Sequence, residues 1–359
     1  MNVIQRRTIG STIVAGFPGR SLCVGLVLLA VTGTACGTEP PGPRPALTGK
    51  ILFVTGWDVF AKMPGHIEVM NADGSVQIGL TNDAAGDSDP AWSPDGTKIA
   101  FTRGLVSDAG AIYVMNADGS AQTRLTSDAS ASDYSPAWSP DGKRLVFVRG
   151  PRGAGDCYGV TDNQSEPQCA PSIIYVMSVD GSGVTRLTYP PARQIDGLNI
   201  QDYSPAWSPD AKRIAFVRGA PGVQSSIYVM RADGTGTTRI TTDEKVGDYY
   251  LEDDRPAWSP NGKQIAFSRS LDGTNIYVMS PNGSELKQLT KKGGTQPTWS
   301  PSGAAIAFVS ERDTPVIPFG PEISYASEIY VMNANGTGVI RITHDDANDV
   351  DPSWSRASA

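Results

Sequence analysis

The sequence predicts an all-β protein, a six-bladed β-propeller built from four-stranded antiparallel blades. Two repeated blocks lead to this fold class. The first is the frame Pro-x-Trp-Ser, whose six tryptophans are Trp92, Trp138, Trp207, Trp258, Trp299 and Trp354. The second is a run of the type Ile-Tyr-Val-Met, whose six methionines are Met70, Met115, Met177, Met230, Met279 and Met332. A repeat of about 40–50 residues with four short β-like runs is typical of a propeller blade.

Each repeat contains four predicted strands in chain order. The Trp-Ser pair ends an innermost strand, and the Pro-Asp-Gly or Pro-Asn-Gly after it forms a tight turn in which glycine adopts a positive φ. The second strand is an alternating run that ends in phenylalanine, as in Ile99 to Phe101. The third is the methionine block, as in Ile112 to Met115. A hairpin at Asp118-Gly119 then leads to an outer strand that ends in Leu-Thr.

The two ends of the chain are predicted to share the last blade. Residues 51–81 contain a second, a third and a fourth strand, but no tryptophan strand precedes them. Residues 351–355 form a tryptophan strand that no other strand follows. Joining these ends removes the exposed sheet edges that would otherwise invite aggregation. We therefore expect residues 50–356 to form one propeller of five complete blades and a sixth blade closed by the N- and C-terminal strands.

The segment before the propeller is predicted to be an export signal (residues 1–35) and a tether (residues 36–49). Arginines precede an apolar run at 22–35 that is shorter than the roughly 20 residues of a membrane span, and small residues follow. Thr34-Ala35-Cys36-Gly37 resembles a bacterial lipoprotein cleavage box, which implies that Cys36 is lipidated. The alternative is an ordinary cleaved signal with a stray cysteine. The proline-rich tether is a stiff, extended spacer.

Charge and cysteine content agree with an exported protein. The net charge of −7 becomes −10 when residues 1–35 are removed, because that segment contains three arginines and no acidic residue. An acidic body repels nucleic acid and anionic lipid headgroups, so nucleic-acid binding is excluded. Cys157 and Cys169 lie in one irregular insertion, 150–172. Two such cysteines in an exported protein predict a disulfide, and a metal site there would need further ligands.

The repeat resembles that of TolB-type propellers, a family of the bacterial envelope. The resemblance rests on the phrase Pro-Ala-Trp-Ser-Pro-Asp-Gly at 136–142, on the Ile-Ala-Phe strands, and on Ile-Tyr-Val-Met with Asp-Gly and Leu-Thr. It covers 51–355 and implies the fold. It is much less specific for function, because similar repeats serve envelope scaffolds, peptide binders and parts of peptidases. The segment 36–50 has no room for the additional N-terminal α/β domain that TolB carries.

All long connections are predicted to lie at one end of the ring, which we call the top face. They are residues 56–65, 150–172, 189–203, 242–254 and 310–326. Aromatic residues that we assign to these connections include Trp57, Tyr134 and Tyr203. Because surface aromatics are enriched at binding patches, the top face is the predicted recognition surface. The alternative is that longer loops simply contain more of every residue type.

Five aspartates stand three residues before the repeat proline: Asp87, Asp133, Asp202, Asp253 and Asp349. Around the mouth of a channel, such carboxylates can bind calcium or the basic end of a peptide. Reflection through the hairpin turn, however, places an arginine opposite four of them, namely Arg103, Arg149, Arg218 and Arg269. The fifth blade lacks both partners, with Gly294 and Ser310, and Asp349 faces Thr55. This joint presence and absence favours cross-strand ion pairs.

The sequence offers little support for catalysis. It contains no Gly-x-Ser-x-Gly elbow and no glycine-rich phosphate loop, and its histidines, His66 and His344, form no metal motif. We therefore predict a non-catalytic monomer that is exported to the periplasm or cell surface, anchored by lipid, and binds a protein or peptide on its top face. The alternative is a propeller enzyme or carbohydrate-binding module, for example a metal-dependent lyase of acidic sugars.

Overall fold

The structure is a computed structural model. Every residue described below lies in the compact unit Pro41–Ala359. The described residues are 47–56, 64–82, 84–104, 110–152, 171–192, 194–195, 198–220, 222–242, 245–246, 249–271, 273–313, 317–319, 322–324 and 326–355. Within these ranges no helix is long and apolar enough to cross a membrane.

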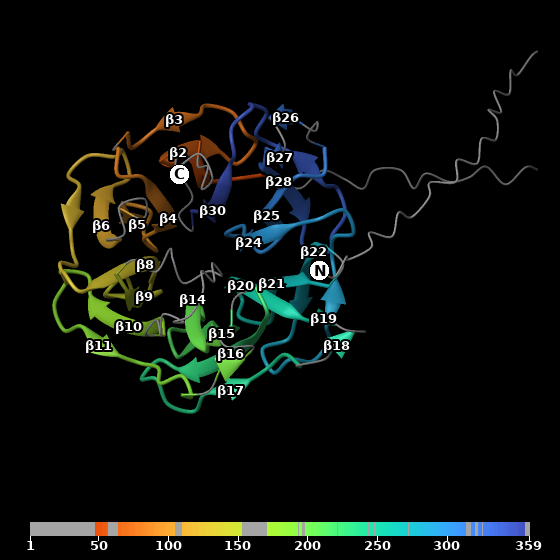
Figure 1. The fold of residues 1–359 in the computed structure, drawn as a ribbon. Coiled ribbons are helices and arrows are strands. Elements are labelled where there is room, and N and C mark those ends of the chain that lie inside the picture. The colour runs from red at the N-terminus through yellow and green to blue at the C-terminus, as the bar shows by residue number, and fades with distance from the viewer. Residues whose placement is uncertain are drawn as a thin grey trace, which may run out of the picture. The chain divides into compact units, whose positions relative to one another are not determined.

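The described strands form six units of four strands each; four of these are separate antiparallel sheets, and the other two are joined into one eight-stranded sheet by a single parallel pairing. Their inner strands are β4 (Asp87–Trp92), β8 (Ala131–Trp138), β14 (Gln201–Trp207), β20 (Glu252–Trp258), β24 (Thr295–Trp299) and β30 (Val350–Trp354). The second strands are β5 (Lys98–Arg103), β9 (Arg144–Pro151), β15 (Arg213–Ala220), β21 (Ile265–Ser270), β25 (Ala305–Ser310) and β1 (Lys50–Thr55). The inner strands surround the centre of the ring in Figure 1.

The third strands lie outside the second strands, and the fourth strands form the outer rim. The third strands are β6 (Ala111–Asn116), β10 (Ile173–Ser178), β16 (Gln224–Arg231), β22 (Thr274–Met279), β28 (Glu328–Asn333) and β2 (His66–Asn71). The outer strands are β7 (Thr123–Arg124), β11 (Thr185–Arg186), β17 (Thr238–Arg239), β23 (Lys287–Gln288), β29 (Ile340–Arg341) and β3 (Ile78–Gly79). The predicted order of four strands per blade is thus confirmed.

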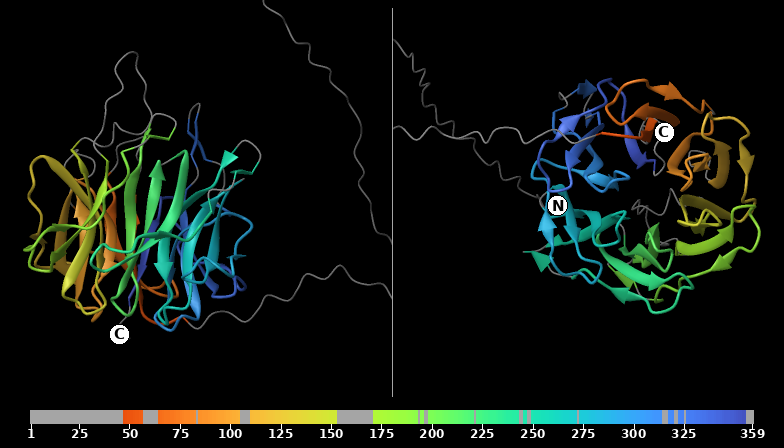
Figure 2. Two further views of the ribbon diagram at one scale, coloured as in Figure 1. Left: turned by 90° about the horizontal axis from the view of Figure 1, so that it is seen from below. Right: turned by 180° about the vertical axis from the view of Figure 1, so that it is seen from behind.

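Three two-stranded hairpins interrupt the long connections. They are β12 (Gln194–Ile195) with β13 (Leu198–Asn199), β18 (Lys245–Val246) with β19 (Tyr249–Tyr250), and β26 (Ile317–Phe319) with β27 (Glu322–Ser324). The first two join an outer strand to the next inner strand, and the third joins a second strand to a third. Because strand direction alternates, all three connections lie at the top end of the ring, as the side view in Figure 2 shows.

The ring closes between the two ends of the described chain. Strand β30 pairs with β1 in an antiparallel register that places Trp354 opposite Ile51 and Ser353 opposite Leu52. Strand β30 also contacts β24 on one side and β4 on the other, so the inner strands form an unbroken circle. The predicted closure of the last blade by the N- and C-terminal strands is therefore confirmed. Below we call this sheet the closing blade.

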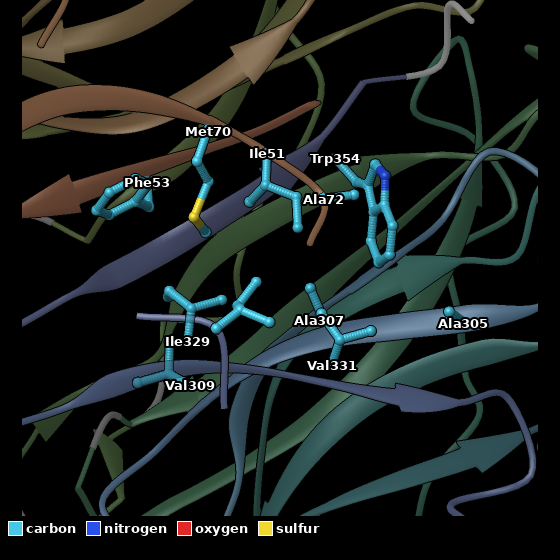
Figure 3. Packing of buried hydrophobic residues seen from close by; sticks show 11 residues of the cluster. Ile51, Phe53, Met70, Ala72, Ala305, Ala307, Val309, Ile329, Val331 and Trp354 are labelled. Atoms are coloured by element: carbon cyan, nitrogen blue, oxygen red, sulfur yellow. The ribbon is translucent and has the colours of Figure 1, made fainter. Parts of the chain in front are cut away.

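The hydrophobic core lies between neighbouring blades, because each sheet is covered on both faces. The phenylalanine within each second strand is at most 1% exposed in all six blades; these residues are Phe53, Phe101, Phe147, Phe216, Phe267 and Phe308. Between the fifth and the closing blade, Ile51 and Met70 pack against Ile329 and Val331, with Trp354 beside them (Figure 3). Burying such side chains stabilises the fold by about 1.5–3 kcal/mol each.

The hairpin between third and outer strands requires glycine for a reason that its turn type alone does not show. Gly119 has a φ of +86°, and a Cβ atom there would lie 2.7 Å from the carbonyl oxygen of Leu80 in the preceding blade. The same clash arises in the other five blades, where the distance is 2.1–2.9 Å. The glycine thus lets each hairpin pack against its neighbour's outer segment, and any side chain would push adjacent blades apart.

Candidate functional site

Four of the five aspartates singled out in the sequence form bidentate ion pairs across the blade. In the blade of β8, Arg149 donates from Nε to Asp133 Oδ1 at 2.6 Å and from Nη2 to Asp133 Oδ2 at 2.8 Å. The same geometry joins Asp87 to Arg103, Asp202 to Arg218 and Asp253 to Arg269. These aspartate side chains are at most 3% exposed. The predicted pairing is confirmed, and both oxygens of each carboxylate are occupied by arginine.

Each paired arginine also covers the aromatic core of its blade. The guanidinium carbon of Arg103 lies 5.2 Å from the ring centre of Phe101 and 5.1 Å from that of Tyr113. A cation placed over two aromatic rings adds a cation–π attraction to the ion pair. The hydrogen bond to Asp133 raises the pKa of the Arg149 guanidinium. This unit of aspartate, arginine and two aromatic rings therefore locks the top end of the blade.

The fifth blade restores the guanidinium from another position. Gly294 and Ser310 replace the aspartate and arginine there, as the sequence shows. Two residues after Ser310, Arg312 turns back, and its guanidinium carbon lies 4.8 Å from the ring centre of Phe308 and 5.0 Å from that of Tyr330. Arg312 donates to Ser310 Oγ at 3.0 Å. The aromatic pair is thus covered although the ion pair is missing, an arrangement that sequence comparison between blades did not reveal.

The closing blade has the aspartate but no arginine in register with it. Asp349 is fully buried, and among the described residues neither of its carboxylate oxygens has a hydrogen-bond partner of good geometry. Thr55 and Thr343 lie close enough to favour its charged form weakly, but burial dominates and raises the pKa of Asp349 to about 7. The predicted lack of an arginine partner is confirmed. This carboxylate is sealed inside the seam between two blades and does not face the channel.

A second ring of six residues lies nearer the centre, directly before the repeat prolines. Its members all adopt left-handed backbone with φ between 48° and 53°; they are Asp89, Ser135, Ser204, Arg255, Gln296 and Asp351. At this point the pairing of inner and second strand shifts register in every blade, as in a β-bulge. Proline fits a bulge because it has no N–H to donate. Left-handed backbone costs a non-glycine residue about 1–3 kcal/mol, and such strain concentrates at functional sites.

These six residues and the prolines after them line a cavity of about 150 Å³ in the centre of the ring. Charged residues enter this lining from opposite sides of the ring. Arg255 comes from β20, opposite β4 in the ring, and its Nη1 lies 3.2 Å from Asp89 Oδ1 and 3.1 Å from Asp351 Oδ1. The Arg255 side chain therefore spans the channel and joins three blades. Its own side chain is 33% exposed to the cavity, whereas that of Asp351 is 3% exposed.

Electrostatics in the cavity are unbalanced. Burial raises the pKa of Asp351 to about 6, although Arg255 opposes that rise. Burial by itself lowers the pKa of Arg255, but Asp351 and Asp89 outweigh it and hold the pKa above its ordinary value. Asp254 lies beside the cavity and accepts hydrogen bonds from Ser204 Oγ at 2.9 Å and from Arg255 N at 2.6 Å. Three carboxylates against one guanidinium give the channel a net negative charge at neutral pH.

The other end of the channel is aromatic. The six repeat tryptophans, with small residues and prolines, line a second cavity of about 180 Å³. Each indole packs against the preceding blade, and the N–H of Trp138 donates to the Ala91 carbonyl at 3.1 Å. All six tryptophans are at most 9% exposed. The tryptophan end therefore consolidates the ring, and the polar end offers the groups that can bind a ligand.

The aromatic candidates lie elsewhere than expected. Tyr134 and Tyr203 belong to the inner strands β8 and β14, not to the top connections, and this assignment was wrong. The inner strands begin earlier than predicted, because the aspartate–arginine pairs extend the ladder beyond the tryptophan frame. Tyr134 donates its hydroxyl to Ser172 Oγ at 2.7 Å. Trp57, Cys36, Cys157 and Cys169 lie outside the described residues.

Sequence analysis missed the ring that lines the cavity. The position before the repeat proline is polar in all six repeats, which was a visible signal. The recurring aspartates two residues earlier gave a stronger pattern. The residue before the repeat proline is Asp, Ser, Arg or Gln, so this position has no constant residue type that would mark it as a site. Among the described residues, no group of three or more His, Cys, Asp and Glu side chains is arranged to hold a metal ion.

Comparisons with known proteins support the fold over part of the sequence. No family model matches the chain. It is 28% identical over 127 residues to the uncharacterised peptidase YuxL of Bacillus subtilis, which is 35% of this chain and 17% of that protein. It is 32% identical over 90 residues to the Tol-Pal system protein TolB of Francisella tularensis, which is 24% of this chain and 19% of that protein. The matches thus span less than a fifth of either relative.

Solved structures match over most of the chain. TolB from Acinetobacter baumannii superposes with a TM-score of 0.64 at 18% identity, covering 86% of this chain and 66% of that one. An oligogalacturonate lyase in complex with manganese gives a TM-score of 0.52 at 14% identity, covering 83% and 82%. A closed ring of four-stranded sheets around a central channel defines a β-propeller. The chain is a TolB-like propeller in fold.

Proposed function

We propose that this chain is a non-catalytic, exported scaffold that binds a protein or peptide on the top face of its propeller. The observation that carries the proposal is the ring of six residues with left-handed backbone that lines the central cavity. Three of these residues, Asp89, Arg255 and Asp351, place charged side chains there. Preorganised polar groups around a cavity are what a binding site needs. The negative channel favours a partner segment with a basic or amino-terminal group.

The likeness to TolB supports an envelope role. The relative from Francisella tularensis is by name a Tol-Pal system protein, and the matching solved structure is also a TolB. We extend that setting to this chain as part of the proposal, with residues 1–35 as export signal, 36–49 as tether and 50–356 as propeller. Cys36 is the proposed lipid attachment point, Cys157 and Cys169 the proposed disulfide, and the body acts as a monomer.

The main experiment compares matched variants as bait. Wild-type propeller, Asp89→Asn and an Asp118→Asn control in an exposed hairpin are used to capture proteins from envelope extracts of the source organism. A partner retained by wild type and control but lost with Asp89→Asn is then purified, and its Kd is measured by calorimetry. We expect Asp89→Asn to weaken the binding of a basic partner segment about tenfold or more, as loss of a desolvated charge at a site does. Equal Kd values for all three proteins would refute a channel-centred site.

The enzyme alternative rests on the fold shared with the lyase. An acidic-sugar substrate would meet the carboxylates of Asp89 and Asp351 in the channel, with that of Asp254 beside it, and like charges there disfavour its binding. A direct assay with oligogalacturonate and manganese ions decides this point. Turnover that is abolished by Arg255→Gln would replace the scaffold proposal with a catalytic one.

Two further measurements test the proposed processing. Membrane fractionation of wild type and Cys36→Ser should show that only wild type sediments with membranes, and equal solubility would remove the anchor. Mass spectrometry of natively exported protein without reduction should find no free thiol at Cys157 and Cys169. Two alkylatable thiols would show that the disulfide does not form.

A further inference from the structure

The seam between the fifth and the closing blade contains an acidic cluster that the binding function does not use. Asp349 stands immediately before β30, the strand that closes the ring. Its backbone N donates to Ser327 O at 2.7 Å, and Gly56 N donates to the neighbouring Asn348 O at 3.1 Å. This short segment therefore ties the start of β28 in the fifth blade to the end of β1 in the closing blade.

Two buried carboxyl groups, those of Glu328 and Asp349, lie in this seam, and among the described residues only one cation, Arg341, pairs with them. Glu328 is fully buried and forms an ion pair with Arg341, while it accepts a hydrogen bond from Thr343 Oγ1 at 2.7 Å. A hydroxyl has one proton, so Thr343 cannot donate to Asp349 at the same time. Arg341 is likewise committed to Glu328. Among the described residues, ionised Asp349 is thus left with the Thr55 hydroxyl beside it and no cation, close to another carboxylate, which is costly in a dry interior.

The strands that pack most closely against β30 are β1, β4, β24, β25 and β28. Their charged and titratable groups are Lys50 on β1, Asp87 and Asp89 on β4, and Glu328 and Tyr330 on β28. The groups that act on the carboxyl of Asp349 are Glu328 and, on the connection to β30, Asp345, and the hydroxyls of Thr55 and Thr343 lie close to it. His344, Asp345 and Asp346 on the same connection are all exposed to solvent. Asp345 raises the pKa of Glu68, Glu328 and Asp349 alike, after burial, which is the larger cause for each.

We propose that this seam is a proton-operated latch, held tightest when Asp349 is protonated and loosened when Asp349 ionises. Protonation removes the uncompensated charge and lets the carboxyl stay buried between the blades. Ionisation sets Asp349 against Glu328 and Asp345 and favours water entry at the point where the two chain ends are joined. The apolar contacts of Ile51, Ile329 and Trp354 in Figure 3 lie in the same seam and hold it when the charge is absent.

The direction of the pH dependence follows from linkage. Burial raises the pKa of Asp349 to about 7 from an ordinary 3.8, and burial raises that of Glu328 to about 7 as well. The folded state therefore binds protons more tightly than the unfolded chain. The resulting stabilisation is fully present below about pH 4 and is lost as the pH rises through about 7. The four arginine-paired blades have no such unpaired carboxylate.

The first test is the variant Asp349→Asn, which keeps the size of the side chain and cannot ionise. Melting temperatures are measured from pH 5 to pH 9 for wild type, Asp349→Asn and an Asp202→Asn control from an arginine-paired blade. We expect the melting temperature of wild type to fall relative to that of Asp349→Asn between pH 5 and pH 7, by about 2–4 °C for each unit by which folding raises the pKa of Asp349, and the difference to level off above pH 7. The Asp202→Asn control should lie below wild type over the whole range. Parallel curves for wild type and Asp349→Asn would overturn the latch.

A second measurement uses wild-type protein only, so it does not depend on whether a variant folds. The side-chain carboxyl of Asp349 is titrated by NMR in wild type, together with hydrogen-exchange protection of the β30 amides compared with those of β8. We expect titration near neutrality and a fall in β30 protection, corrected for intrinsic exchange, that β8 does not share. A carboxyl that titrates near pH 4, or equal protection changes in β8 and β30, would refute the proposal. Neither outcome depends on whether a partner binds the channel.

Discussion

The four arginine-paired blades and the closing blade all bury an aspartate at the start of the inner strand, but they surround it with different side chains. In the paired blades a buried carboxylate meets a bidentate guanidinium that also covers two aromatic rings. In the closing blade Thr55 replaces the arginine and Glu68 stands opposite Phe53 where the other blades place a tyrosine. The carboxylate of Asp349 remains buried all the same. Four of the five blades made from one continuous segment are thus locked by an ion pair, and the blade made from both chain ends is not.

The fifth blade shows which part of the lock matters most for packing. It lost the aspartate and the arginine together, yet Arg312 supplies a guanidinium over the same aromatic pair. A guanidinium is planar and weakly hydrated, so it covers an aromatic face well even without a carboxylate partner. The aromatic cover is therefore present in five blades and the ion pair in four.

The largest expected effect comes from breaking the closing blade. Deletion of residues 351–359 removes most of β30 and with it Trp354, which is 4% exposed. Loss of one core tryptophan costs about 3–5 kcal/mol, and here strand pairing is lost too. Urea unfolding should show a midpoint far below that of Trp138→Ala, in which the ring stays closed. An unchanged midpoint for the truncated protein would mean that β30 does not close the ring.

The next effect tests the lock of a paired blade. Asp202→Asn leaves Arg218 buried without its carboxylate, which should cost about 3–5 kcal/mol, and Asp202→Asn with Arg218→Gln should recover part of that loss. Arg149 would be a less clear choice, because it also lies 3.3 Å from Asp128. The burial of the aspartate makes this effect larger than that of an exposed pair. Chemical denaturation of the two single variants and the double variant measures the coupling, and additive losses would contradict it.

A smaller effect is expected at the channel. In Arg255→Gln, the buried Asp351 loses its cation, and we expect a cost of about 1–3 kcal/mol above pH 6. Asp351 has a pKa of about 6 in the presence of Arg255, raised by burial from 3.8. Its stabilising contribution is therefore present at low pH and lost as the pH rises through 6, and removal of Arg255 raises this pKa further. Unfolding curves at pH 5 and pH 8 should diverge, and equal losses at both would contradict the pairing.

The smallest effect concerns the substitute arginine. Arg312→Met removes a cation over Phe308 and Tyr330 without leaving a buried carboxylate unpaired, so the expected loss is about 0.5–2 kcal/mol. Arg103→Met should lower the free energy of unfolding more, because it also leaves the buried carboxylate of Asp87 without its ion-pair partner. The two variants together divide the lock into its aromatic and ionic parts. Equal losses in thermal or urea unfolding would show that the ion pair adds nothing to the aromatic contact.

The sequence by itself determined the repeat, the four-strand order, the shared last blade and the aspartate–arginine register. These follow from local patterns, because strand period, turn chemistry and cross-strand opposition act between residues close in the repeat. The unpaired Asp349 was equally visible, since its partner position holds Thr55. Only the tertiary structure shows that Asp349 is buried beside Glu328, which comes from another blade.

Tertiary structure alone decided what meets in the centre and at the seams. Asp89, Arg255 and Asp351 lie far apart in the chain, and only ring closure brings Arg255 across the channel to both carboxylates. The bulge that turns these residues inward is a property of strand pairing. Arg312 reaches its aromatic pair by a backbone turn that no repeat pattern encodes. Such contacts depend on blades meeting in space, and a sequence repeat describes each blade but not the geometry between them.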